Sequence, residues 1–372
     1  MKSKIRFLTL HPEGTNVDLV KDEGQIPYTL SKMGVEATLV TSYINKKTAN
    51  LDTVKGLKVK HFPFIINSGI TGIIYIFLHA KQIDWLNFYF AGRKALWWAK
   101  LYKFLNSKGK IYLKLDMDYR SCDLYDRNLK ERQIFYKCTK IVDIVSIESE
   151  SIKNRIQKYS DKNLLVIRDG VAEIYDKNIN ITSKMNLFIT VARLGTMQKA
   201  TDILLNAFAL SAEYHNWNLL LIGNIENDFK DYIEKFFEKF PSMVNRVIFA
   251  GSISDRNKLY DNYCKSKVFV LPSRWESFGI SAVEALSCGC RLILSDQIPP
   301  ACEMTNNWKY GFIVEKDNID DLTNKMIEMT KYDFNQEEIN EMVTYAKQEF
   351  SWEGICEILY LEMSKLSLTG DC

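Results

Sequence analysis

The stretch KVFVLPSRWESFGISAVEALSCGCRLIL, residues 267–294, decides the fold of this 372-residue chain. Its apolar run from Lys267 to Leu271 predicts a buried strand, and the apolar positions after Ser277 fall mainly on one helical face. Gly289 then supplies a stop signal for the helix. The order of strand, short loop, helix and next strand is the repeating unit of a parallel α/β sheet.

Two glutamates in this stretch are candidates for ligand binding. Glu276 falls in the loop at the carboxyl edge of the predicted strand, and Glu284 falls about two turns along the helix. Open α/β sheets bind ligands at this edge, and a helix N-terminus there offers N–H groups to a phosphate. Because carboxylates accept hydrogen bonds from sugar hydroxyls, the pattern favours a nucleotide-sugar site. Two glutamates at this spacing also occur by chance in many helices.

The complete string carries more information than the pair. Its Pro-Ser before Arg274, its Phe-Gly after Ser277 and its Ala-Leu before Gly289 resemble the donor-site signature of the retaining "group 1" glycosyltransferases, family four. The resemblance is strongest over residues 186–314. It implies an α/β fold of the GT-B type, in which two Rossmann-like domains with parallel sheets face a cleft and a C-terminal helix crosses back.

The resemblance also implies roles for residues of the string. Glu276 would hold hydroxyls of the transferred sugar and Glu284 those of the ribose. The donor diphosphate would lie at the start of the helix, beside Ser277, Phe278 and Gly279.

Alternating strand and helix patterns continue along the rest of the chain. Strands are predicted at residues 5–10, 36–41, 57–62, 85–90, 110–115, 141–147, 164–167, 187–192, 218–222, 247–250, 267–271, 291–294 and 312–314. We expect an acceptor-side domain over residues 1–172 and a nucleotide-sugar-binding domain over residues 173–350. The polar run 172–186 would link them, and residues 351–372 would form a helix that packs back on the first domain.

Two cations follow the predicted strand 187–192. Arg193 and Lys199 lie in a strand-to-helix loop, where Arg suits bidentate contacts to phosphate and Lys acts as a point charge. Alone they could be two solvated loop charges. The segment resembles the family's arginine, short loop and Lys-Gly pair, with Ala200 in place of that glycine, and this implies that both cations stabilise the departing diphosphate.

Further candidate residues come from other strand ends. Gly223 ends the predicted strand 218–222 and would let a backbone approach the donor, although a plain turn explains it equally well. Gly14 stands where the family has adjacent glycines facing the donor phosphate. Asp116 and Asp118 follow the strand 110–115, at a point that faces the acceptor in relatives. Their D-x-D spacing is also the pattern that holds a divalent metal in the other glycosyltransferase fold.

Charge divides the chain into a basic and an acidic half. Residues 1–172 contain 29 Lys and Arg against 17 Asp and Glu, whereas the remainder contains 20 against 29. A basic half favours an anionic surface or acceptor, and no nucleic-acid recognition motif accompanies it. Eight scattered cysteines without a C-x-x-C pair indicate a reducing compartment, and lysines and an arginine interrupt the start of the chain. We therefore expect a cytoplasmic protein.

One predicted helix, beginning at Arg93 and running to about residue 110, combines cations with aromatic side chains. On its helical wheel Trp97 and Phe104 fall on the same side as Arg93, Lys100 and Lys108, away from the apolar face. Exposed aromatic rings among cations suggest peripheral contact with an anionic membrane on the cytoplasmic face. The alternative is that the two rings pack under a neighbouring loop.

The resemblance to this family implies a retaining glycosyltransferase. It would move a hexose-type sugar from a nucleotide diphosphate donor, which we expect to be UDP-linked, to a hydroxyl of a glycan or lipid-linked acceptor. The resemblance implies no metal and no other cofactor.

A Lys-, Ile- and Asn-rich composition associates the chain with bacterial capsule or cell-wall polysaccharide. One alternative is a non-catalytic partner subunit that binds a glycan or a sister enzyme. A nicotinamide-dependent oxidoreductase is disfavoured because no G-x-G-x-x-G follows a strand.

Overall fold

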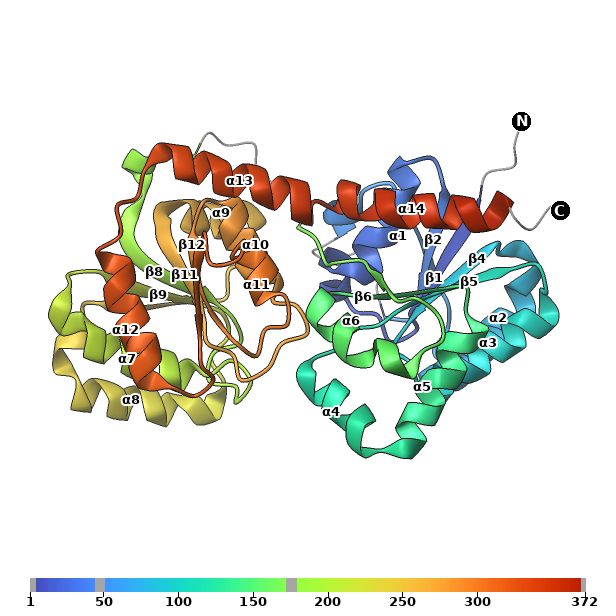
Figure 1. Ribbon diagram of the computed structural model, residues 1–372, viewed down its shortest axis with the longest axis horizontal. Helices are drawn as coiled ribbons and strands as arrows, with labels where there is room; N and C mark the ends of the chain where they lie inside the picture. The colour runs from blue at the N-terminus through green and yellow to red at the C-terminus, as the bar shows by residue number, and fades with distance from the viewer. Residues whose placement is uncertain (1–4, 44–50, 172–178, 369–372) are drawn as a thin grey trace. The chain divides into compact units, whose positions relative to one another are not determined.

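The computed structural model describes residues 5–43, 51–171 and 179–368, apart from the side chain of residue 368. The chain divides into two compact units (Figure 1). The first unit comprises residues 1–172 and 350–372, and the second comprises residues 173–349.

The first unit is built on a parallel sheet of seven strands. Its strands are β1 (Arg6–Leu10), β2 (Glu36–Thr41), β3 (Lys58–His61), β4 (Trp85–Tyr89), β5 (Lys110–Lys114), β6 (Ile144–Ile147) and β7 (Leu165–Val166), in the order β3-β2-β1-β4-β5-β6-β7. Its helices are α1 (Asp22–Lys32), α2 (Ser68–His79), α3 (Arg93–Leu105), α4 (Tyr119–Arg127), α5 (Leu129–Ile141), α6 (Glu150–Ile156) and α14 (Trp352–Leu368). Because every strand pair is parallel, all carboxyl ends of the strands lie at one edge.

The second unit repeats this plan with six parallel strands. They are β8 (Met185–Val191), β9 (Asn218–Ile222), β10 (Val247–Gly251), β11 (Ser266–Leu271), β12 (Arg291–Ser295) and β13 (Gly311–Val314), in the order β10-β9-β8-β11-β12-β13. The helices are α7 (Thr201–Ser211), α8 (Lys230–Lys239), α9 (Arg256–Lys265), α10 (Ile280–Ser287), α11 (Ala301–Met304), α12 (Ile319–Thr330) and α13 (Gln336–Phe350). β8 and β11 are neighbours, so the loops after them meet at the carboxyl edge of this sheet.

Burial explains why these segments form strands. All five residues of β4 and the last four of β11 are buried, as the near-continuous apolar runs of a covered parallel sheet require. The polar side chain of Asn87 in β4 is satisfied, because it accepts a hydrogen bond from Thr9 (2.9 Å) and donates one to the carbonyl of Tyr112 (3.2 Å). The predicted architecture of two parallel α/β sheets is confirmed.

The C-terminal segment returns to the first unit. α14 packs against α1, and its buried residues Trp352, Ile355 and Leu359 belong to the same apolar cluster as Ile26 of α1. This is the C-terminal helix that the sequence predicted.

Several predicted boundaries need correction. The strand expected at 141–147 begins at Ile144, because Ile141 completes α5. The helix expected to run to about residue 110 ends at Leu105, where Asn106 begins a turn that Gly109 closes by donating to its carbonyl (3.1 Å). The helix that carries Glu284 begins at Ile280. Of the predicted linker 172–186, residues 172–178 lie outside the described residues.

Candidate functional site

The carboxyl edge of the second sheet brings Lys199 and Glu276 into contact. Lys199 lies in the loop after β8 and Glu276 in the loop after β11, and the ammonium of Lys199 forms an ion pair with the carboxylate. The hydroxyl of Ser273 donates to the same carboxylate oxygen (2.7 Å). Both charged side chains are largely buried, with 17% and 7% of their side-chain surface exposed. Contacts from two loops therefore fix the orientation of Glu276.

Gln198 links Arg193 to this pair. Its amide oxygen accepts from the guanidinium of Arg193 (3.1 Å), and its amide nitrogen lies 3.3 Å from the second carboxylate oxygen of Glu276. The structure thus gathers the three predicted charged residues around one glutamine. Gln198 was not predicted, because its role depends on how the two loops meet.

Arg274 connects the loop after β11 to the loop after β8. Its backbone N–H donates to the carbonyl of Gln198 (2.8 Å), and its guanidinium forms ion pairs with Asp202 (2.8 Å) and Asp317 (2.5 Å). Arg274 could have been identified from the sequence, since it lies within residues 267–294, the stretch that resembles the donor-site signature.

Ala200, the residue in place of the family's glycine, adopts a left-handed conformation. Its φ is 49° and its ψ is 42°, at the N-cap of α7, and its side chain is fully buried. This region costs an L-residue roughly 1–2 kcal/mol. The loop that carries Lys199 therefore keeps a backbone shape that glycine adopts without strain.

The N-terminus of α10 lies directly after the Glu276 loop. Gly279 has a φ of 95° and caps the helix, and no side chain of the described residues supplies a cap hydrogen bond there. Phe278 is buried and Ser277 is half-buried. An uncapped helix start at this edge has the geometry and the dipole that favour a phosphate group.

Glu284, in the second turn of α10, is held by two side chains of α9. Arg256 forms an ion pair with one of its carboxylate oxygens (2.6 Å), and the hydroxyl of Tyr263 donates to the other (3.0 Å). Burial lowers the pKa of Arg256, but the carboxylate of Glu284 outweighs this and leaves that pKa raised. The sequence did not identify Arg256 or Tyr263, because they come from a helix whose contact with α10 only the fold defines.

Gly223 has a structural explanation. Its φ is 145°, and an added Cβ would lie 1.7 Å from the carbonyl oxygen of Ala192, so only glycine fits where the ends of β8 and β9 meet. This close packing explains the glycine, and its predicted contact with the donor stays a prediction.

The predicted residues of the first unit lie at the carboxyl edge of its own sheet. Gly14 closes a turn after β1 by donating to the carbonyl of His11 (2.9 Å), and its carbonyl accepts from Thr41 (2.8 Å). Asp118 caps α4 by accepting from the backbone of Ser121 (2.9 Å). Asp116 is exposed.

A buried charge cluster at this edge was not predicted. The ammonium of Lys114 at the end of β5 is fully buried, and it lies 2.8 Å from Glu148, 3.0 Å from Asp169 and 3.5 Å from Asp22. Burial raises the pKa of Asp169 to about 7, and the nearby ammonium of Lys114 limits the rise. Burial also raises the pKa of Glu148, which shares the ammonium of Lys114 with Asp169.

Metal-ligating side chains converge at one other point of this edge. Among the described residues, His11, Asp18 and Glu23 offer ligand atoms within 4.8 Å of one another. Neither Asp116 nor Asp118 belongs to this group.

Comparison with known proteins agrees with the geometry. Residues 171–349 match the family model of the group 1 glycosyl transferases. An uncharacterized 41.2 kDa protein in the cps region of Klebsiella pneumoniae is 27% identical over 194 residues, which cover 52% of this chain and 48% of that protein. The chain thus matches about half, or less, of the length of such curated relatives.

Solved structures match almost the whole chain. Sucrose-phosphate synthase from Thermosynechococcus elongatus has a TM-score of 0.73 at 15% identity, covering 98% of this chain and 100% of that one. The Anabaena HepE protein, solved in complex with UDP, has a TM-score of 0.73 at 17% identity over the same shares. These likenesses establish the GT-B fold. Residues 171–349 therefore form a domain that matches the group 1 glycosyl transferase family.

Proposed function

We propose that this chain is a retaining glycosyltransferase that moves a hexose-type sugar from a UDP-linked donor to a hydroxyl of a glycan acceptor. The observation that carries the proposal is the Lys199–Glu276 pair beside the uncapped start of α10, at the carboxyl edge of the second sheet. A cation, a helix N-terminus and an oriented carboxylate are what a diphosphate joined to a sugar requires.

Each residue would act on a stated part of the donor. Lys199 and Arg193 would stabilise the charge that develops on the departing diphosphate, which is the kind of interaction that contributes most to catalysis in many enzymes. Glu276 would accept hydrogen bonds from hydroxyls of the sugar, and Glu284 from those of the ribose. With two protein cations at the diphosphate, the reaction would need no metal ion. A phosphate oxygen of the donor would take the proton of the attacking hydroxyl on the same face.

Two relatives support the finer parts of the proposal. HepE, which shares the fold, was solved with UDP, and this favours UDP as the leaving group here. The Klebsiella relative comes from a cps region, and this favours a role in capsule or cell-wall polysaccharide synthesis.

A donor screen tests the proposal. The purified protein is incubated with a panel of nucleotide-sugars, release of nucleotide is measured, and the anomeric configuration of the transferred sugar is read by NMR. We expect release of UDP from one sugar class and retention of configuration. Inversion would refute the retaining mechanism. Binding of UDP without turnover of any donor, with or without an acceptor glycan, would instead indicate a non-catalytic partner subunit.

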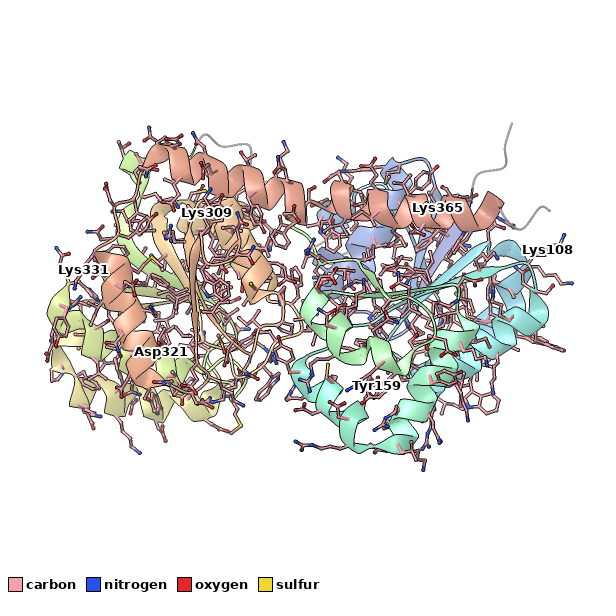
Figure 2. All side chains as sticks on the ribbon, viewed as in Figure 1. Lys108, Tyr159, Lys309, Asp321, Lys331 and Lys365 are labelled. Carbon is pink, nitrogen blue, oxygen red and sulfur yellow. The ribbon has the colours of Figure 1, made fainter. Side chains whose placement is uncertain are left out.

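We also propose that α3 contacts the cytoplasmic face of a membrane, where a lipid-linked acceptor would reside. Trp97 and Phe104 are 65% and 85% exposed, so they do not pack under a neighbouring loop. Lys100 lies 5.9 Å from the ring of Trp97, and Arg93 and Lys108 are exposed. Figure 2 shows Lys108 extending from the turn after α3. Among the helices of the described ranges, none has the length and apolar character needed to cross a bilayer.

A further inference from the structure

The helix α2 exposes apolar side chains along the side opposite its buried face. Tyr75 and Ile76 are buried in the core of the first unit. Ile73, Phe77 and Leu78 are 37%, 66% and 57% exposed. Surface helices of soluble proteins usually turn polar residues to solvent, so a helix that is apolar on both sides indicates a further contact surface.

This exposed side of α2 continues onto α3. The two helices lie side by side (Figure 1), and they approach so closely that a Cβ on Gly72 would lie 2.1 Å from the ring of Trp98. By helical position, Ile73 and Phe77 lie on the part of the exposed surface of α2 that is nearer to α3. Trp97 lies on the part of the exposed surface of α3 that is nearer to α2. We call the surface formed by Ile73, Phe77, Leu78, Trp97 and Phe104 the α2–α3 surface.

A basic cavity lies at the C-terminal end of α2. It has a volume of about 280 Å³ and lies between the strands β1 to β3 and the last turn of α2, where Tyr75 and His79 line it. Lys58 and Lys60 of β3 line it from the sheet. The cavity is large enough for a phosphate group and borders the helix that carries Phe77 and Leu78.

The two lysines dominate the charge of this cavity. Arg6 also lines it, but its guanidinium is held by Asp84 (2.6 Å). Lys58 lies 3.8 Å from Glu36, a lining residue, and Lys60 forms no ion pair within the described residues. Lysine ammonium groups bind phosphate as point charges, so an anionic group is the complementary occupant.

We propose that the α2–α3 surface docks on an anionic bilayer, with the phosphate of a lipid headgroup in the cavity of Lys58 and Lys60. The inference extends the membrane contact proposed for α3 and rests on it. The lysines would give the docking its preference for negative headgroups, and the apolar side chains would enter the interface and add binding that charge alone does not supply. Charge complementarity beside an apolar surface favours a lipid over a protein partner.

Docking of this kind would be reversible. A lysine near an anionic surface contributes roughly 1 kcal/mol, and salt screens the interaction. An enzyme bound in this way could reach a lipid-linked acceptor and still exchange a soluble donor.

The test is co-sedimentation of the full chain with vesicles of phosphatidylcholine alone and of phosphatidylcholine mixed with phosphatidylglycerol. One variant combines Lys58→Ala with Lys60→Ala, and a second combines Phe77→Ser with Leu78→Ser. The matched controls are Lys130→Ala with Lys137→Ala, exposed on α5, and Ile358→Ser with Leu361→Ser, exposed on α14. Thermal melts show whether each variant is folded, and UDP release shows donor activity independently of the membrane.

We expect the wild-type chain to bind only the anionic vesicles, and less at high salt. The Lys58/Lys60 variant should bind about fivefold more weakly per lysine removed. The Phe77/Leu78 variant should bind at least about a hundredfold more weakly, because burying such side chains contributes roughly 1.5–3 kcal/mol each. Both controls should bind as the wild type does, and soluble glycerol phosphate should not displace the protein.

Other results would overturn the inference. Equal binding to both vesicle types, no binding to either, or equal loss in the controls would each contradict it. Displacement by glycerol phosphate would indicate a site for a soluble phosphate ester. Loss of a dimer in the Phe77/Leu78 variant, without vesicle binding by the wild type, would assign the surface to a second copy of the chain. Since UDP release needs no membrane, failure of docking leaves the proposed transfer reaction standing.

Discussion

The ion pair between Lys199 and Glu276 joins the loop after β8 to the loop after β11, although 77 positions separate the two residues in the chain. The two loops meet because β8 and β11 are neighbours in the sheet. The pair holds a cation and a carboxylate side by side at the sheet edge, where a diphosphate and its sugar would be bound together.

Removing the cation should affect both donor binding and turnover. We expect Lys199→Ala to weaken UDP binding, measured by calorimetry, by roughly tenfold or more, since a charge-assisted contact to an anion contributes about 1.5–3 kcal/mol. Turnover should fall further, because the charge on the diphosphate grows as it departs. Lys230→Ala on α8, exposed at its helix start, is the control. Unchanged UDP affinity in Lys199→Ala would place the diphosphate elsewhere.

The left-handed backbone at Ala200 predicts an unusual response to glycine. Ala200→Gly should destabilise the protein by roughly 1–2 kcal/mol less than Ala207→Gly in the interior of α7, because glycine relieves left-handed strain only at position 200. Both alanine side chains are fully buried, so each substitution removes the same methyl group. Urea denaturation measures the difference, and equal destabilisation would show that Ala200 is unstrained.

Transfer should survive an excess of chelator. Arg193 and Lys199 supply the positive charge at the proposed diphosphate site, so neither binding nor turnover should depend on a divalent ion. Activity is measured with EDTA and after adding back manganese. Loss with EDTA and rescue by manganese would point instead to a diphosphate site at Asp116 and Asp118.

The buried cluster around Lys114 predicts a pH effect on stability. Burial raises the pKa of Asp169 to about 7, above its unfolded value, so the folded state binds this proton more tightly. The resulting stabilisation is fully present below the unfolded pKa and is lost as pH rises towards 7. Between pH 5 and 8, the melting temperature of the wild type should therefore fall more steeply with rising pH than that of Asp169→Asn. The exposed Asp52→Asn should follow the wild type, and parallel curves for all three proteins would contradict the raised pKa.

The sequence predicted the strands, their alternation with helices in two parallel sheets, and the loops that carry Lys199 and Glu276. These features could be predicted because buried parallel strands leave long apolar runs and the site residues directly follow such runs. It could not predict the partners of these residues. Gln198, Arg256 and Tyr263 act through contacts between elements, and which side chains meet depends on strand order and helix packing. Lys114 illustrates the same limit, since its carboxyl partners are brought together only by the neighbouring positions of β5, β6 and β7.

The most direct test of the account separates donor binding from transfer at Glu276. UDP affinity is measured by calorimetry and sugar transfer is measured with the donor and acceptor found by the screen, for the wild type, Glu276→Ala and Glu276→Gln. We predict that both variants bind UDP within a few-fold of the wild type, because Glu276 would contact the sugar and leave the nucleotide to other groups. Transfer by Glu276→Ala should be abolished, and Glu276→Gln should recover little of it, since an amide replaces the acceptor-only carboxylate. Near-wild-type transfer by Glu276→Ala, with UDP binding intact, would show that Glu276 does not hold the transferred sugar.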